Sequence, residues 1–271
     1  MVAIEKYALR LRFSGGEADH HRLELYDGTT SLHGFAQAIQ IATHAYLNKE
    51  VVSRATALKG AKFFIKAPRD GSLIFDIISE IEKYPALVTI AAPIFYDFLK
   101  YSFKIATGAL NARADTPYVS KLSTKDEPFF DELGESMEGS LQRAHRAIDC
   151  GVAKITLERP RSKLVTFDAS TSDWVNTREE DKSVDIYDGN ITRYNSVTGN
   201  GRAYISRIGK IVPFRPAEDF PSNKRGLLTW SLHGNTIAGE KQLRLYARKI
   251  QSARGEIKRL VLSDCSNMPD Q

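Results

Sequence analysis

The sequence predicts an α+β protein, with an N-terminal α/β domain that contains an antiparallel hairpin and helices, followed by a small C-terminal β-barrel of the OB or SH3 type. In the N-terminal part, segments with strand-like alternation are interspersed with helical apolar stripes. The last third consists of short apolar segments separated by glycine-containing turns. Charge is also segregated: residues 183–265 hold fourteen Lys and Arg against seven Asp and Glu, whereas the whole chain has a net charge of only +5.

The spacing of apolar residues predicts the first strands and the first helix of the chain. Residues 7–13 alternate between apolar and charged side chains, which predicts a strand with one wet face. The pair at 27–28, Asp-Gly, predicts a turn, and apolar residues at steps of three and four predict a helix over 29–48. Residues 61–67 and 73–77 alternate on either side of a Pro-Arg-Asp-Gly turn, so this is the chain's clearest predicted hairpin.

The segment 86–107 starts with the most apolar run of the chain and continues as an aromatic helix, with Pro93 predicted to kink it. The apolar run is shorter than the roughly 20 residues that a membrane helix needs, so no transmembrane span is expected. One interpretation is a core helix of the N-terminal domain, and the other is a helix for oligomerisation or for the membrane surface. The aromatic residues that would make such contacts are Phe95, Tyr96, Phe98, Tyr101 and Phe103.

The middle of the chain predicts the domain boundary. Residues 111–128 are polar and are expected to form a surface connection, followed by a helix over 128–149 and strands at 152–158 and 164–167. The polar run 168–182 is the best candidate for a linker. The predicted organisation is a domain at 1–167, a linker at 168–182, a barrel at 183–265 and a tail at 266–271.

The barrel is predicted from spacing, with a helical segment over 224–238 capping one end. Its excess of positive charge favours an anionic partner, because fixed cations concentrate anions and release counterions on contact. The predicted strands are 183–187, 190–195, 201–206, 210–214, 242–251 and 256–262.

Residues 189–205 contain a glycine-led strand that ends in an aromatic–asparagine pair, a turn, and a glycine-punctuated strand with one further tyrosine. This segment resembles the opening hairpin of cold-shock-type OB barrels, which stack single-stranded bases on aromatic rings. The resemblance implies that Tyr194 and Tyr204 are stacking rings and that Arg193 and Arg202 contact phosphates. The alternative is that both tyrosines simply pack the barrel.

Taken over its whole length, the chain also resembles a bacterial family of uncharacterised proteins suspected of a place in phage-defence or mobile-element loci. The resemblance implies antiviral defence and brings no catalytic residues. It rests on Gly34-Phe35-Ala36, Lys59-Gly60-Ala61, the hairpin at 68–76 and Gly199-Asn200-Gly201-Arg202.

The triplet Asp19-His20-His21 resembles the metal-binding triplet of DHH phosphoesterases, which implies metal-dependent phosphodiester hydrolysis. The upstream aspartates of that family have no counterpart between Leu9 and Gly16, and a solvated loop is the other interpretation. The phosphate-binding, zinc-protease and serine-hydrolase motifs do not occur. Enzymatic activity is therefore not the leading expectation.

The combined prediction is a non-enzymatic binding or assembly protein, without a cofactor or metal, whose barrel contacts nucleic acid or a nucleotide-like anion. A second copy or a partner protein is the other expected partner. Two isolated cysteines, Cys150 and Cys265, and an N-terminus without the layout of a secretory signal indicate a cytoplasmic protein. The predicted nucleic-acid-binding residues are Arg193, Tyr194, Arg202, Tyr204, Arg207, Lys210, Arg244, Arg248 and Lys249.

Overall fold

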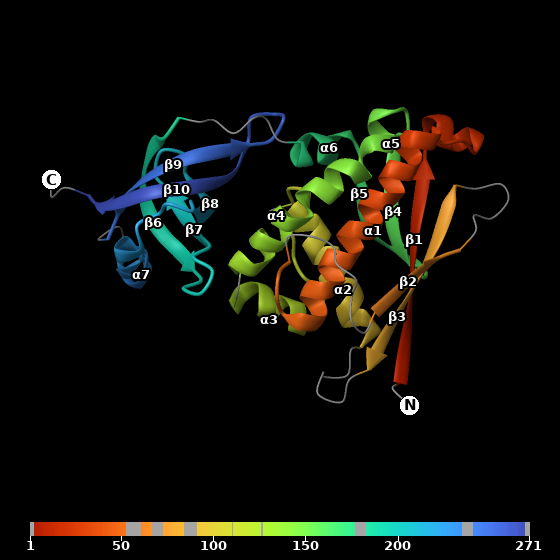
Figure 1. Cartoon of the computed structure of the whole chain (residues 1–271), viewed down its shortest axis with the longest axis horizontal. Helices are drawn as coiled ribbons and strands as arrows, with labels where there is room; N and C mark the ends of the chain where they lie inside the picture. Colours follow the sequence, from red (N-terminus) through yellow and green to blue (C-terminus); the bar gives the residue numbers. More distant parts are fainter. Residues whose placement is uncertain are drawn as a thin grey trace. The chain divides into compact units, whose positions relative to one another are not determined.

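A computed structural model of the chain (Figure 1) confirms the α+β class, with a five-stranded sheet, helices and a separate closed barrel. The chain forms two compact units: the first comprises residues 1–123 and 133–175, and the second comprises residues 124–132 and 176–271. The structure describes residues 3–52, 61–66, 73–83, 91–109, 111–125, 127–176, 183–234 and 241–268.

The sheet of the first unit has the order β2-β3-β1-β4-β5, and all its neighbouring strands are antiparallel. The predicted hairpin is confirmed by the pairing of β2 with β3, although its turn lies outside the described residues. The predicted alternation is also confirmed, because Leu9 and Leu11 are buried while Arg10 forms an ion pair with Asp76 on the opposite face. The strands are β1 (Ala3–Ser14), β2 (Ala61–Ile65), β3 (Ile74–Lys83), β4 (Lys154–Arg159) and β5 (Ser162–Phe167).

Aromatic rings from the helices fill the core against this sheet. Tyr46 and Phe95 have ring centroids 5.5 Å apart, Tyr7 lies 4.9 Å from Phe95, and Phe35 lies 5.0 Å from Phe167. Tilted and edge-to-face aromatic pairs of this kind add to the stabilisation that comes from the burial of large apolar surfaces. The helices before the barrel are η1 (Gly16–His20), α1 (Leu25–Asn48), α2 (Ala92–Ala106), α3 (Pro117–Lys125), α4 (Glu127–Ala144), α5 (Arg146–Asp149) and α6 (Ala169–Val175).

Helix α1 begins earlier than predicted, and the Asp27-Gly28 pair lies inside it instead of forming a turn. The carboxylate of Glu24 accepts a hydrogen bond from the backbone N–H of Asp27 at 2.6 Å and caps the helix. A Cβ at Gly28 would lie 2.9 Å from the Cβ of Leu23, so the glycine serves close packing.

Helix α2 is not kinked by Pro93, contrary to the prediction, because the proline lies in the first turn, where its missing N–H is not needed. Residues 86–90 of the predicted helix lie outside the described residues. The predicted helix at 128–149 is interrupted at His145, between α4 and α5.

Two segments that were predicted to be irregular contain helices. The connection at 111–128 includes α3, and the run at 168–182 includes α6. Helix α6 is capped locally, because the carboxylate of Asp168 accepts hydrogen bonds from the N–H groups of Ser170 and Thr171 at 2.9 and 3.1 Å. Residues 177–182 are not among the described residues.

The second unit contains a closed barrel of five strands in the order β10-β8-β7-β6-β9, so the predicted small barrel is confirmed (Figure 1). Strand β10 pairs with β8 in parallel, and the other pairs are antiparallel. Helix α7 (Arg225–Gly234) follows η2 (Ser222–Lys224) between β8 and β9, and its Leu228 packs into the barrel core. The strands are β6 (Asp185–Tyr194), β7 (Gly201–Ile205), β8 (Lys210–Pro216), β9 (Leu243–Gln251) and β10 (Ile257–Asn267).

The two strands predicted at 183–187 and 190–195 are one continuous strand, β6. Asp188 and Gly189 lie between the two predicted strands, where the sequence predicts a glycine-containing turn. In the structure, a Cβ at Gly189 would lie 1.9 Å from the carbonyl oxygen of Tyr204. The glycine is therefore needed for the close approach of two strand backbones.

Candidate nucleic-acid interface on the barrel

Strand β7 places Tyr204 on the outer surface of the barrel. Ala203 and Ile205 are buried in the core, so the strand period turns Tyr204 outward. Tyr204 is 42% exposed and pairs with Ile211 of β8, which is 51% exposed. On its other side, Tyr204 pairs with Asn190 of β6. An exposed aromatic ring and an exposed aliphatic side chain thus lie next to each other on β7 and β8.

The other predicted stacking ring, Tyr194, does not lie on this surface. It packs against the barrel core and stacks on Phe214, with ring centroids 6.5 Å apart and an angle of 20° between the planes. Burial raises the pKa of its hydroxyl. The cause is a register shift in β6 between Ile191 and Arg193, which reverses the inward and outward positions that follow. The position of Tyr194 therefore agrees with the alternative interpretation, in which this tyrosine packs the barrel.

Of the two arginines implied by the resemblance, Arg193 is exposed and lies opposite Arg202 across β6 and β7. Arg202 makes a bidentate pair with Asp131, also in the second unit, at 2.7 and 2.9 Å, and its side chain is only 13% exposed. A buried bidentate pair uses both the charge and the planar donor geometry of the guanidinium. Arg202 therefore takes part in a structural ion pair with Asp131.

A second group of predicted residues gathers around Asp185. Arg207 and Lys249 lie 3.5 and 3.8 Å from one carboxylate oxygen of Asp185. The guanidinium of Arg207 also lies 4.0 Å from the ring centroid of Tyr187. Two of the predicted cations thus share one carboxylate at this end of the barrel. Lys210, at the start of β8, is exposed and forms no ion pair with any described residue.

The remaining predicted cations lie on β9. Arg244 pairs with Asp188 of β6 at 3.0 and 3.4 Å, and this pairing raises the pKa of the arginine. Arg248 is half-buried on the same strand. The nine predicted residues therefore do not form one uniform basic face. Tyr204 and Ile211 lie side by side, Arg193 lies opposite Arg202 further along the same hairpin, and the exposed Lys210 directly precedes Ile211 in β8.

Ile211 was missed as a site residue at the level of sequence. Its signal is the alternation of β8, in which Val212 and Phe214 point into the core and Ile211 has the opposite parity. An apolar residue on the solvent-facing side of a strand can indicate a binding surface, and the charge pattern alone does not reveal it.

The aromatic residues of α2 lie in the core of the first unit. Phe95, Phe98 and Phe103 are fully buried, and Tyr96 and Tyr101 are nearly so. The described part of α2 therefore offers no exposed aromatic surface for a partner or a membrane, and the interpretation as a core helix accounts for its composition. None of the described helices combines the length and apolar character needed to cross a bilayer.

The triplet at 19–21 makes structural contacts. A carboxylate oxygen of Asp19 accepts a hydrogen bond from the N–H of Gly15 at 2.8 Å, and His21 ends η1 in the left-handed conformation. In the part of the chain that the structure describes, no three histidine, cysteine or acidic residues are grouped so that they could hold a metal ion. The hypothesis of a phosphoesterase stays a prediction.

The family described as "Domain of unknown function (DUF7946)" matches residues 9–112, which lie in the first unit. No curated protein and no solved structure matches the chain.

Proposed function

We propose that the barrel binds single-stranded nucleic acid across the outer face of β7 and β8. In this proposal a base stacks on Tyr204, Ile211 contacts the same base or its sugar, and Arg193 and Lys210 contact backbone phosphates. The observation that carries the proposal is the exposed pair of Tyr204 and Ile211 on adjacent strands. Stacking on an aromatic ring tolerates any base, so the expected preference is for single strands and not for a sequence.

The topology supports this choice of face. A closed five-stranded barrel with a helix between its third and fourth strands is the architecture of OB-type barrels, which bind oligonucleotides on strands two and three. Here those strands are β7 and β8. Such binding would be compatible with the phage-defence setting that the whole-chain resemblance implies.

The test is a fluorescence-anisotropy titration of labelled oligo-dT and oligo-U with the full chain at two salt concentrations. We expect binding that weakens with salt, because released counterions supply part of the free energy. Tyr204→Ala should lower the affinity roughly 5- to 150-fold, the equivalent of about 1–3 kcal/mol for one stacked base. Lys210→Ala should weaken binding and reduce the salt slope by about one.

Tyr26→Ala is the matched control, because Tyr26 is an exposed tyrosine of α1 in the other unit. It should leave the affinity unchanged. Absence of binding at low salt, or a Tyr204→Ala protein that binds like the wild type, would overturn the proposal.

A further inference from the structure

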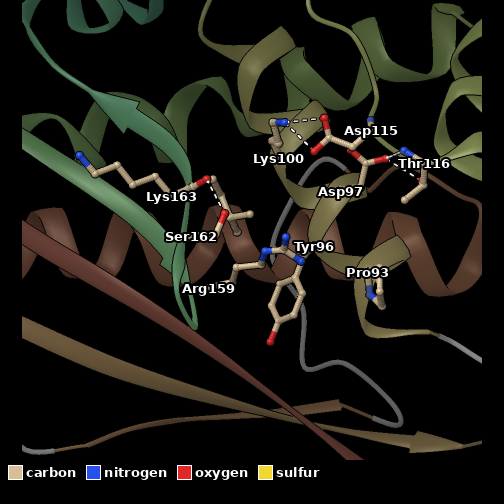
Figure 2. A pocket seen from close by; sticks show the side chains of 10 residues that line it. Pro93, Tyr96, Asp97, Lys100, Asp115, Thr116, Arg159, Ser162 and Lys163 are labelled. Carbon is tan, nitrogen blue, oxygen red and sulfur yellow. Dashed lines mark hydrogen bonds and ion pairs between the residues drawn. The ribbon is translucent and has the colours of Figure 1, made fainter.

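The first unit contains a small pocket between α2, the start of α3 and the hairpin β4–β5 (Figure 2). Its volume is about 110 Å³. Sites for whole drug-sized ligands are usually of the order of 300–1,000 Å³, so this pocket would hold one chemical group and leave the rest of a ligand outside. Three cationic side chains, Lys100, Arg159 and Lys163, line it.

Both acidic side chains of the pocket are already occupied. The carboxylate of Asp97 accepts three hydrogen bonds, from the N–H of Asp115 and from the N–H and hydroxyl of Thr116, at 2.6 to 2.9 Å. Asp115 accepts two bonds from the ammonium of Lys100, at 2.7 and 2.6 Å (Figure 2). The cations outnumber the acids, and the excess charge resides on β4 and β5.

Arg159 is the central cation of this excess. It has no ion pair with any described residue, and its guanidinium lies 5.7 Å from the ring centroid of Tyr96. That ring is fixed, because the hydroxyl of Tyr96 donates to the carbonyl of Ala8 at 3.0 Å and accepts from the N–H of Ala8 at 3.1 Å. A guanidinium held over a fixed ring keeps its planar set of donors available at little cost in conformational entropy.

Two further donors lie on the same hairpin. The hydroxyl of Ser162 donates only a long bond, 3.3 Å, to the carbonyl of Lys163. Lys163 is exposed, has no ion pair with a described residue, and extends away from the other side chains in Figure 2. Its long stem allows the ammonium to turn toward an anion in the pocket.

We propose that this pocket binds the phosphate group of a small phosphomonoester, with Arg159 as the bidentate ligand and Lys163, Ser162 and Lys100 as supporting donors. The planar fork of N–H donors on Arg159 fits two phosphate oxygens, and the remaining phosphate oxygens can accept hydrogen bonds from the supporting donors, which a carboxylate with only two oxygens cannot provide. The exposed carboxylate of Asp115 is the resident anion on Lys100. Because exposed ion pairs contribute little stability, an incoming phosphate can compete with it for that lysine.

The experiment is a thermal-unfolding and calorimetric titration of the full chain with inorganic phosphate, sulfate and a nucleoside monophosphate, with chloride added to keep ionic strength constant. A ligand that binds only the folded state raises the unfolding temperature. We expect such a rise with phosphate and with the nucleoside monophosphate. If the nucleoside monophosphate binds more tightly than inorganic phosphate, the natural ligand is a nucleotide. If the two affinities are equal, the protein recognises the phosphate group alone.

Arg159→Gln should weaken binding at least about tenfold, because a charge-assisted bidentate contact is lost. Arg159→Lys keeps the positive charge but removes the planar pair of N–H donors, so it should also weaken binding. This variant tests the proposal if the Arg159→Gln protein does not fold. Asp115→Asn should strengthen binding, since it removes the competing anion. Arg161→Gln is the matched control, because Arg161 lies in the turn of the same hairpin and does not line the pocket.

A phosphate response no larger than that of chloride, or an Arg159→Lys protein that binds like the wild type, would overturn the proposal. The site is independent of the barrel interface. Arg159→Gln should therefore leave binding to oligo-dT unchanged, and Tyr204→Ala should leave the phosphate response unchanged, so that failure of one proposal can be told from failure of the other.

Discussion

The backbone N–H and the hydroxyl of Thr116 both donate hydrogen bonds to one carboxylate oxygen of Asp97, at 2.7 and 2.6 Å. Asp97 lies on α2 and is buried, and Thr116 directly precedes α3. The hydroxyl oxygen of Thr116 also lies 3.4 Å from the N–H of Val119, in the first turn of α3. A carboxylate on one helix therefore fixes the start of the next.

Replacement of Asp97 should consequently destabilise the first unit. Asp97→Ala removes three charge-assisted hydrogen bonds and leaves their partly buried donors without this acceptor, at a cost of about 3 kcal/mol. Urea unfolding followed by circular dichroism measures this loss. Asp115→Asn, which alters only an exposed ion pair, should change the free energy of unfolding by no more than about 0.5 kcal/mol. Equal effects of the two variants would show that Asp97 does not organise α3.

Gly189 should not tolerate a side chain. A Cβ at this position would lie 1.9 Å from the carbonyl oxygen of Tyr204, so Gly189→Ala must separate β6 from β7. We expect a loss of about 3 kcal/mol in the stability of the barrel, measured by chemical denaturation. Gly226→Ala is the matched control, because a Cβ there meets no atom within 4 Å and alanine favours the helix α7. A stable Gly189→Ala protein would contradict the described pairing of β6 with β7.

The buried ring of His145 should make the first unit less stable in acid. Its Nδ1 lies 2.7 Å from the carbonyl oxygen of Leu141 and therefore carries the proton, while Nε2 lies 2.9 Å from the hydroxyl of Thr171. Burial lowers its pKa below the ordinary value of 6.5, although the nearby carboxylates of Asp149 and Asp168 act in the opposite direction. Between the lowered native pKa and the unfolded pKa, the unfolded chain binds a proton that the native protein does not.

The contribution of His145 is therefore complete above about pH 6.5 and falls as the pH drops toward the native pKa, with a slope of at most about 1.4 kcal/mol per pH unit. Urea unfolding from pH 7.5 to pH 5 measures this slope. His145→Gln should flatten it, whereas His33→Gln, at an exposed position, should not. If His145→Gln retains the wild-type slope, another group is responsible.

Cys150 should react slowly although it is exposed. Its thiol donates a hydrogen bond to a carboxylate oxygen of Asp27 at 2.7 Å, and this bond raises the pKa of the thiol. Asp27→Asn should lower that pKa and accelerate alkylation by iodoacetamide at pH 7.5, since the thiolate is the nucleophile. Arg146→Gln should slow the reaction, because the Arg146 cation lowers the pKa of the thiol.

Cys265 provides the internal comparison for this measurement. It is buried in the barrel, and burial raises its pKa to about 11, so it should stay unmodified until the protein is unfolded. Unchanged kinetics in the Asp27→Asn protein would show that the carboxylate does not control the thiol.

Several features could be predicted because they depend on local sequence. The alternation of residues 7–13 predicts β1, and the two alternating segments around 68–71 predict the pairing of β2 with β3. Glycine-punctuated short segments predict the barrel, whose closure the structure confirms. Strand period and turn chemistry operate over a few residues, so a single chain displays them directly.

Other features depend on groups far apart in the chain. The start of α3 is fixed by hydrogen bonds to Asp97, which precedes the donors Asp115 and Thr116 by eighteen and nineteen residues. The Asp188-Gly189 pair has the residues of a turn, but the approach of β7 makes it part of a strand. The resemblance to a cold-shock hairpin predicts that Tyr194 and Tyr204 are both stacking rings. In the structure, a register shift in β6 places Tyr194 against the core, whereas Tyr204 lies on the surface.

The sequence alone thus determined the class of the protein, the two kinds of architecture and the excess of positive charge on the barrel, because composition and period are properties of neighbouring residues. Only the tertiary structure decided which of those charges are paired, which tyrosine is exposed, and that Arg159 lies over Tyr96 beside a pocket. The physical reason is that ion pairing, burial and pockets arise from the packing of segments that are distant in the chain, and a linear pattern does not contain those distances.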